Sequence, residues 1–470
     1  MFLTLFSKFL PLFCNFLRRY LAKTYIAYIS LYYIPQGGEH MTQQAGKSKF
    51  SVQFIAAVIV TLIVGMAIGF AASGFFAGPQ QGQPQQPAGG QPSASKKVIQ
   101  IGFTLPLTGS LSSIGKIWEK VAQMAIEDLN KEVQAYGFNV EFKAVILDDG
   151  TSVDKAVSNV QTLAQQGIKV VIGPAASSQV KAVKSFADSN QIVIISPSST
   201  APTLAIPNDF IFRTVGSDAG QAKVLATLAF QEGARKVIVF HRNDEYGNAF
   251  ADFFSKAFTQ FGGKVVDMPY QPDLSDYAAD VNSLASKVQT EQADAVVLIS
   301  FDTDGGNILS HAAESSILSS VRWFLSEGPH GAAELKTPAV GAFAAKVKLL
   351  GTRPLFVANP LYEEFKQKLK EKYGVDATVF CDNLYDAVQV AGWAILRAGS
   401  NDGNAIRNAL VEVAKHYYGV SGWTIFDSAG DKANQDYGVW AIVKTGAGYD
   451  FKDVGFYQNG QIIFTEKPYP

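Results

Sequence analysis

The chain reads KVVIGPAASSQ at residues 169–179 and IVIISPSSTAPTL at residues 192–204. Each stretch begins with a short, β-branched apolar run, which is typical of a strand buried on both faces of a sheet. Each run then leads into Gly or Pro and a cluster of hydroxyl residues, where a helix is expected to begin. Two neighbouring parallel strands would bring Ser177, Ser199 and Thr200 together at the carboxyl edge of the sheet, where ligands bind in open α/β proteins.

These hydroxyl clusters have two interpretations. Ser and Thr are common helix N-caps, so one such loop would indicate capping alone. Two adjacent loops of the same kind favour a binding site. A helix N-terminus lined with hydroxyls and backbone N–H groups suits a small carboxylate.

The composition describes a globular protein with some extra apolar sequence. The chain has 470 residues, of which 47% are hydrophobic and 17% charged, and this length predicts two or three domains. A formal net charge of -1, without a basic stripe among aromatics, argues against a nucleic-acid partner. Two cysteines, Cys14 and Cys381, and five histidines lack the spacing of a disulfide framework or metal centre, so we expect no metal and no cofactor.

The first forty residues are rich in Phe, Leu and Tyr but are interrupted by Lys, Arg and Pro. No uninterrupted run reaches the roughly 20 apolar residues of a membrane span. Residues 1–40 are therefore an uncertain extension, either an additional membrane segment or sequence upstream of a true start at Met41, which we favour.

Residues 50–78 form an uncharged, largely apolar run, long enough to span about 30 Å of hydrocarbon and longer than the roughly 7–15 apolar residues of a signal peptide. Lys47 and Lys49 precede it, which predicts a short cytoplasmic segment at 41–49 and an extracytoplasmic remainder. We expect a single-pass transmembrane anchor or uncleaved signal, although small residues at 71–74 leave cleavage open.

Residues 79–97 are a spacer dominated by Gln, Pro and Gly. Such a segment buries too little apolar surface to order itself and is expected to form a stalk.

From Val98 onward, strands and helices alternate, which predicts an α/β fold with parallel sheets built from βαβ units. Two series of similar length predict two Rossmann-like lobes. The expected strands are 98–105, 140–147, 169–172, 192–195, 210–215, 236–241, 293–300, 321–326, 437–443 and 448–456. The expected helices include 116–133, 153–164, 222–231, 248–261, 278–290, 305–315, 359–373, 382–398 and 405–416.

Seven short motifs occur in order within this region: GFTLPLTG at 102–109, IGP at 172–174 with Ser177 and Ser178, SPSST at 196–200, FRT at 212–214, NDEYG at 243–247, SEG at 326–328 and YDA at 385–387. Each motif alone is a weak signal, but their order over some 370 residues is specific. From about Val98 to its end, the chain resembles the substrate-binding proteins of branched-chain amino-acid ABC transporters, which have the type I periplasmic-binding-protein fold.

The resemblance implies two lobes, joined by crossing strands, that close around a ligand. Lobe 1 would comprise residues 98–218 and 350–438, and lobe 2 residues 219–349 and 439–470. Proteins of this family are not enzymes; they capture a solute and deliver it to membrane permease subunits. The resemblance therefore implies an amino-acid-like small molecule and an ABC permease as partners.

The resemblance also implies an amino-acid site with opposite chemistry at its two ends. Ser177 would hold the α-carboxylate, and Glu327 would face the α-ammonium. Tyr246 and Phe301 would close over the ligand from lobe 2. Around these, the ligand-binding set would be completed by backbone or hydroxyl groups of Ala175, Ser178, Ser198, Ser199 and Thr200, and Ile114 and Trp118 are candidate pocket-lining residues.

Glu327 and the two aromatic residues also have simpler explanations. Most glutamates lie in solvated loops, and most aromatic residues at strand ends belong to the hydrophobic core. Ile114 stands where relatives often carry an aromatic, and the serines at 198 and 199 make the site more polar than a pure leucine pocket.

Two other functions compete with import. The first is the ligand-binding ectodomain of a sensor or receptor for amides, urea or amino acids. The second is an enzyme with Ser177 or Ser199 as nucleophile, but no G-x-S-x-G elbow or Ser-x-x-Lys frame surrounds either residue. We therefore expect no catalytic residues.

Overall fold

The computed structural model describes residues 95–355 and 359–469. The predicted extension, cytoplasmic segment and transmembrane run (residues 1–78) and all but the last residues of the 79–97 stalk lie outside the described residues. Among the described helices, none combines the length and apolar character needed to cross a membrane.

The first sheet has five parallel strands in the order β2-β1-β3-β4-β5. They are β1 (Lys97–Leu105), β2 (Val140–Asp148), β3 (Val170–Ile172), β4 (Val193–Ser196) and β5 (Ile211–Arg213). The prediction from the two opening stretches is confirmed, because β3 and β4 are parallel neighbours with Ile172 opposite Ile195.

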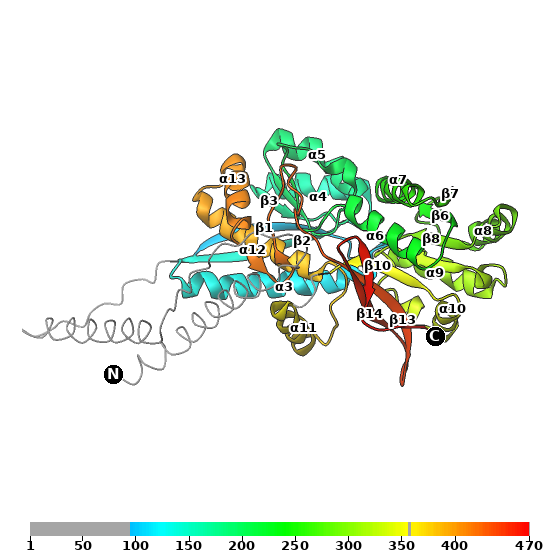
Figure 1. The fold of residues 1–470 in the computed structure, drawn as a ribbon. Coiled ribbons are helices and arrows are strands. Elements are labelled where there is room, and N and C mark those ends of the chain that lie inside the picture. Colours follow the sequence, from blue (N-terminus) through cyan, green and yellow to red (C-terminus); the bar gives the residue numbers. More distant parts are fainter. Residues whose placement is uncertain (1–94, 356–358, 470) are drawn as a thin grey trace, which may run out of the picture. The chain divides into compact units, whose positions relative to one another are not determined.

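Helices cover both faces of this sheet (Figure 1). Successive strand residues face opposite sides, so Val171 and Ile194 pack against α4 (Val153–Gln165) and α5 (Ser177–Asn190). Val170, Ile172 and their neighbours in β4 belong to the core on the other face. That face is covered by α3 (Ser112–Ala135), α11 (Pro360–Tyr373), α12 (Cys381–Ala398) and α13 (Gly403–Ala414).

The second sheet has eight strands in the order β15-β14-β13-β10-β9-β8-β6-β7. Its parallel part comprises β6 (Lys236–Arg242), β7 (Lys264–Tyr270), β8 (Ala295–Ile299), β9 (Arg322–Leu325) and β10 (Leu350–Pro354). One face packs on α6 (Asp218–Gln231) and α7 (Glu245–Gln260). The other packs on α8 (Ala278–Glu291), α9 (Asp302–Glu314) and α10 (Pro338–Lys346).

The prediction of parallel sheets is confirmed, but one edge of the second sheet carries antiparallel strands that it did not include. There β13 (Tyr437–Thr445), β14 (Gly448–Gln458) and β15 (Gln461–Phe464) run antiparallel. Two-residue connections join these strands, and a connection that short can join only antiparallel strands. The second connection is Asn459-Gly460 with positive φ at both residues, the combination that a type I′ hairpin turn requires.

The chain passes between the sheets three times: after β5, after β10 and before β13. Because β10 and the start of β13 pair within the second sheet, these passages lie a few residues away from the expected boundaries at 350 and 438. The division into two lobes itself stays a prediction.

Four helices begin three or four residues earlier than predicted, at Ser112, Asp218, Glu245 and Asp302. The prediction began each helix near its first apolar residues, whereas polar groups start them. Ser217 caps α6, and Asp244 caps α7 by accepting from the Gly247 N–H at 2.9 Å. This shift places Asp218 in the first turn of α6.

Candidate ligand site

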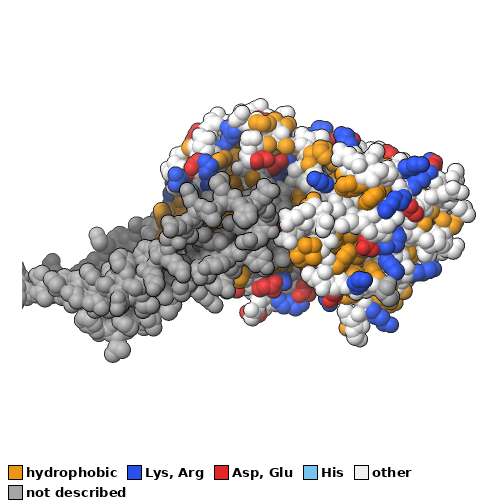
Figure 2. All heavy atoms as spheres, in the orientation of Figure 1, with side chains coloured by type: hydrophobic (Ala, Val, Ile, Leu, Met, Phe, Trp, Pro, Cys, Tyr) orange, Lys and Arg blue, Asp and Glu red, His pale blue; other side chains and the backbone are white. Residues whose placement is uncertain are grey.

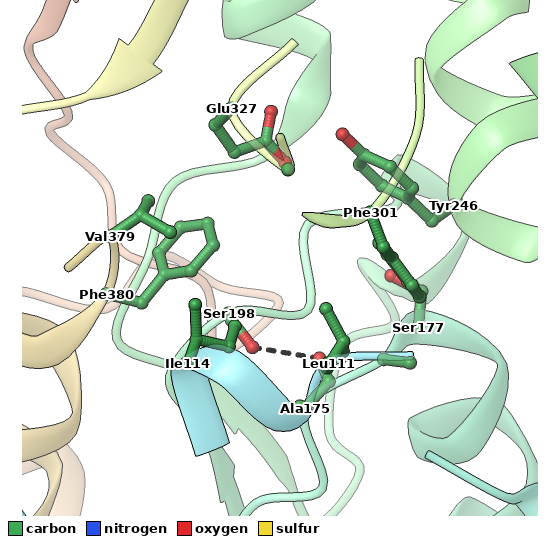
Figure 3. Close-up of a pocket in the computed structure, with 12 residues that line it drawn as sticks. Leu111, Ile114, Ala175, Ser177, Ser198, Tyr246, Phe301, Glu327, Val379 and Phe380 are labelled. Carbon is green, nitrogen blue, oxygen red and sulfur yellow. Dashed lines mark hydrogen bonds between the residues drawn. The ribbon is translucent and has the colours of Figure 1, made fainter. Parts of the chain in front are cut away.

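A cavity lies where the carboxyl ends of strands from both sheets meet (Figure 3). Its volume, counted as the positions open to the centre of a water molecule, is about 30 Å³. Twelve residues line it: Leu111, Ile114, Ala175, Ala176, Ser177, Ser198, Tyr246, Phe301, Glu327, Gly328, Val379 and Phe380. Seven of the predicted site residues are thus brought together, and Ser178, Ser199, Thr200 and Trp118 are not among the lining residues.

Ser177 is presented to the cavity by the sharp turn after β3. Gly173 has φ +92°, and a Cβ there would lie 2.1 Å from the Thr104 carbonyl oxygen, so only glycine fits. The N-cap of α5 is Ala176, whose side chain cannot cap; capping therefore does not explain Ser177. Its Oγ lies 3.2 Å from Ser199 Oγ and accepts from the Ala201 N–H at 3.3 Å, which leaves a proton to donate into the cavity.

The other serines of the two loops mainly fasten the loops together. Ser196 Oγ donates to the Pro174 carbonyl at 2.7 Å, and Ser198 Oγ donates to the Ala175 carbonyl at 2.9 Å (Figure 3). Ser199 Oγ is directed to Ser177. Of the four serines at 177, 196, 198 and 199, Ser177 is therefore the one whose proton is directed to no other described group.

Thr200 lies behind the cavity wall and is almost completely buried. Its carbonyl accepts from the Asp218 N–H at 2.9 Å. Its N–H forms no hydrogen bond with another described residue. Its hydroxyl has no partner at hydrogen-bonding geometry, but it lies close enough to Asp218 to act against the rise in the pKa of that acid. The Thr200 N–H is therefore the donor of this residue that is left for a ligand or a water.

Glu327 forms the acidic end of the cavity, on the opposite side from Ser177 (Figure 3). It follows β9, and only 3% of its surface is exposed, so a solvated loop glutamate is excluded. Burial raises its pKa to about 7, although hydrogen bonds from Tyr246 and Gln221 act in the other direction. Gln221 Nε2 donates to Glu327 Oε2 at 2.6 Å.

Asp218 is a second acid at this end that the sequence analysis missed. It is completely buried, and neither of its carboxyl oxygens has a hydrogen-bond partner among the described residues. Burial and the charge of Glu327 raise its pKa well above the usual value. Ser217 followed by Asp218 is an N-cap and first-turn signal, and reading it would have started α6 at the correct residue.

An aromatic wall comes from the second sheet. The rings of Tyr246 and Phe301 stack with centroids 5.5 Å apart, and the Tyr246 hydroxyl lies 3.0 Å from Ser326 Oγ. The buried Arg242 guanidinium lies 3.5 Å from the Phe301 ring centroid and is paired with Asp304 at 3.0 Å. These contacts on several sides hold the wall in one position.

The remaining wall is apolar, formed by Leu111, Ile114, Val379 and Phe380. Trp118 supports it from behind: its Nε1 donates to the Val379 carbonyl at 3.3 Å, and its ring meets Phe380 edge-on at 6.4 Å. Phe380 has φ +65°, a rare conformation for a bulky residue that tends to mark functional sites. The type of residue at 379–380 gave no signal for this role.

Comparison with known proteins identifies the family. The model for the periplasmic binding protein family matches residues 98–447. The chain belongs to this family.

This periplasmic binding protein is similar to several proteins of other organisms. It is 28% identical over 386 residues to an uncharacterized protein of Methanocaldococcus jannaschii, covering 77% of this chain and 91% of the relative. It is 27% identical to Leu/Ile/Val-binding protein homolog 3 of Brucella melitensis, covering 74% and 92%. The crystal structure of the branched-chain amino acid transporter substrate-binding protein LivJ from Streptococcus pneumoniae, in complex with isoleucine, is 22% identical with a TM-score of 0.64, covering 76% of this chain and 99% of that one.

Family membership makes the chain a solute-binding protein rather than an enzyme.

Within the described residues, no group of His, Cys, Asp and Glu is arranged to hold a metal ion. On the face in Figure 2, Lys and Arg side chains are interspersed with Asp and Glu and form no continuous basic patch.

In this periplasmic binding protein, polar contacts connect the two halves around the cavity. Ser113 at the start of α3 donates to Asp302, and Thr303 Oγ1 donates to the Ser110 carbonyl at 2.9 Å. On another side, Glu245 of α7 accepts from Lys181 Nζ at 2.7 Å and from Thr203 Oγ1 at 2.5 Å. The structure therefore represents a closed arrangement of these elements.

Proposed function

We propose that the protein binds a free amino acid with an apolar side chain in this cavity and delivers it to the permease of an ABC importer. One observation carries the proposal: a single cavity has the Ser177 hydroxyl and the start of α5 at one end, the buried carboxyl group of Glu327 at the other and an apolar wall beside them. That arrangement matches the three parts of such a molecule.

The donor end suits the α-carboxylate. Ser177 offers its hydroxyl, and the first turn of α5 offers backbone N–H groups that have no partner within a helix. Ala175, Ser178, Ser199 and Thr200 belong to the two loops that surround this end. Donors of this kind bind a carboxylate without a full positive counter-charge.

The acidic end suits the α-ammonium. A buried, ionised Glu327 needs a cationic partner, since burial of an unpaired charge is costly. Asp218 lies within electrostatic reach of it, so the ammonium would relieve the repulsion between the two acids. Because one ammonium balances only one carboxylate, we expect Asp218 to keep its proton in the complex.

The apolar wall favours a branched aliphatic side chain. Leu111, Ile114, Val379 and Phe380 offer no polar atom from their side chains, so a polar ligand side chain would lose its hydration without compensation. The names of the Brucella relative and of the isoleucine-bound Streptococcus structure support this choice.

We further propose an extracytoplasmic location, with the uncharged run at 50–78 as a membrane anchor and the 79–97 segment as a stalk. The residue pattern of the run and the function of the relatives support this arrangement. Isolation of the protein with membranes tests the anchor, and the mass of the isolated protein shows whether the chain has been cleaved.

The alternative is a sensor ectodomain that binds an amide, urea or an amino acid. Urea and simple amides carry no positive charge, so neither would compensate Glu327, whereas a sensor for amino acids would differ from an importer in its partner and not in its ligand. A gene neighbourhood with permease and ATPase genes favours import.

Calorimetry with the full-length protein tests the proposed ligand. We expect L-leucine, L-isoleucine or L-valine to bind at least about tenfold more tightly than L-leucinamide, which lacks the carboxylate, or 4-methylpentanoate, which lacks the ammonium. Tighter binding of urea or a simple amide than of any amino acid would overturn the proposal in favour of the sensor.

A further inference from the structure

Arg213, the last residue of β5, lies behind the loop that carries Thr200 and is 1% exposed. Its Nη1 donates to the Ser199 carbonyl at 3.1 Å and to the Ala201 carbonyl at 2.8 Å. Its Nε and Nη2 donate to the two carboxylate oxygens of Asp431. One buried guanidinium thus holds two carbonyls of the ligand loop and one distant carboxylate.

The backbone strengthens this connection. The Arg213 N–H donates to the Gly430 carbonyl at 2.9 Å, and the Lys432 N–H donates to the Arg213 carbonyl at 3.0 Å. Residues 430–432 therefore lie along β5 like a short additional strand. They directly precede residues 433–436, where the chain passes to β13 of the second sheet.

The orientation of the loop follows from these bonds. In a planar trans peptide the carbonyl and the next N–H point in opposite directions. With its carbonyl bound to Arg213, Ser199 directs the Thr200 N–H away from the guanidinium. The same rule applies one residue later: the Thr200 carbonyl accepts from Asp218, and the Ala201 N–H donates to Ser177.

We propose that Arg213, held by Asp431, is a positioning residue that directs the Thr200 N–H toward the carboxylate of the bound solute. The pair also fixes this loop to the segment that enters the passage to β13. This inference rests on the proposed function of the cavity. It adds a role for two residues that do not themselves line the cavity.

Arg213→Lys tests the proposal while keeping the buried positive charge. A lysine can pair with Asp431, but its single ammonium cannot reproduce the planar fork that also reaches two carbonyls. The matched control is Arg322→Lys. Arg322 also pairs with a carboxylate, Glu232 at 3.0 Å, and with the Glu232 carbonyl at 3.3 Å, but it lies at the opposite end of its strand from the cavity.

Two measurements on the full-length protein decide the outcome. Hydrogen exchange without ligand should become at least about tenfold faster in the peptide covering 196–204 of Arg213→Lys and stay unchanged there in Arg322→Lys. Calorimetry with L-leucine should give an affinity about tenfold lower for Arg213→Lys only. Unchanged exchange and unchanged affinity in Arg213→Lys would overturn the positioning role.

A second variant separates positioning from stability. Arg213→Met/Asp431→Leu removes both charges, so no buried charge is left unpaired; the Ser199 and Ala201 carbonyls lose their donor, so the variant should fold with a moderately lower melting temperature than the parent. The proposal expects its affinity for L-leucine to remain reduced about tenfold or more. Parent-like affinity in this folded double variant would show that the pair only stabilises the fold. If the parent itself fails to bind any amino acid, the proposed function fails, and the exchange of residues 196–204 still decides the role of Arg213.

Discussion

The carboxyl groups of Asp218 and Glu327 interact electrostatically, although one begins α6 and the other follows β9. Each is buried, and the charge of Glu327 raises the pKa of Asp218 further. Two acids in this arrangement resist holding two negative charges without a cation. The proton content of the pair should therefore change when an ammonium group binds.

The interaction between the two buried acids predicts that the affinity for L-leucine depends on pH. The pKa of Glu327 is raised to about 7 by burial, and an ammonium prefers the ionised form. Below pH 7 binding must expel a proton, so the affinity for L-leucine should fall as the pH is lowered from about 8 to about 5.5, by up to about tenfold per unit. Calorimetry in buffers of different ionisation enthalpy should also detect proton release near pH 6.5. A flat affinity profile with no proton release would show that Glu327 does not face the ammonium.

Glu327→Gln should have opposite effects on binding and on stability. The amide keeps the shape but loses the charge, so affinity for an amino acid should fall by at least about 2 kcal/mol. Because its folded-state pKa is raised from 4.5 to about 7, the carboxyl destabilises the fold progressively as the pH rises from 4.5, with the full effect above about 7. The ligand-free variant should consequently melt at a higher temperature than the parent at pH 8 but not at pH 4.5.

Glu314→Gln, an exposed acid on α9, is the control for both measurements and should change neither. Wild-type affinity in Glu327→Gln would remove Glu327 from the site. Equal melting temperatures at pH 8 would mean that Glu327 is not a strained buried acid in the free protein.

Ser177 and its neighbour Ser178 form a matched pair at the other end of the cavity. Ser177→Ala removes a cavity-lining hydroxyl whose proton is left for the ligand, and the loss of a hydrogen bond to a carboxylate is worth about 1.5–3 kcal/mol. Ser178→Ala, on the same helical turn but outside the cavity lining, should cost less than about 0.5 kcal/mol. Equal losses in the two variants would contradict the assignment of the carboxylate to Ser177.

The sequence predicted those parts of the site that depend on short, local residue patterns. Ser177 and Glu327 each come soon after a strand whose apolar run is unambiguous, and residues at the ends of parallel strands gather at the carboxyl edge of a sheet. The Asn459-Gly460 hairpin was also readable, but only its first strand, at 448–456, was predicted, and the strand at Gln461–Phe464 was missed. In each of these cases, the residues that determine the local structure lie within a few positions of one another in the sequence.

The unpredicted parts depend on contacts between distant residues. Arg213 and Asp431 are 218 positions apart, and no spacing rule connects them. Phe380 reaches the cavity through an unusual backbone conformation that its side-chain type does not favour. Asp218 is the exception, since its capping signal was local and was passed over in favour of the apolar residues after it.

Glu245 provides a test of closure, because its carboxylate joins α7 to Lys181 of α5 and to Thr203 after β4. Glu245→Ala removes both contacts. Partly exposed pairs contribute about 0.2–1 kcal/mol each, so dissociation of L-leucine should become a few-fold faster. The radius of gyration of the ligand-free protein should also increase in X-ray scattering.

The control is Asp252→Ala, which breaks an ion pair to Lys256 at 2.6 Å within the same helix and should leave both quantities unchanged. If Glu245→Ala behaves like Asp252→Ala, these contacts do not hold the closed arrangement, and the contacts of Ser113 and Thr303 with the opposite half must do so.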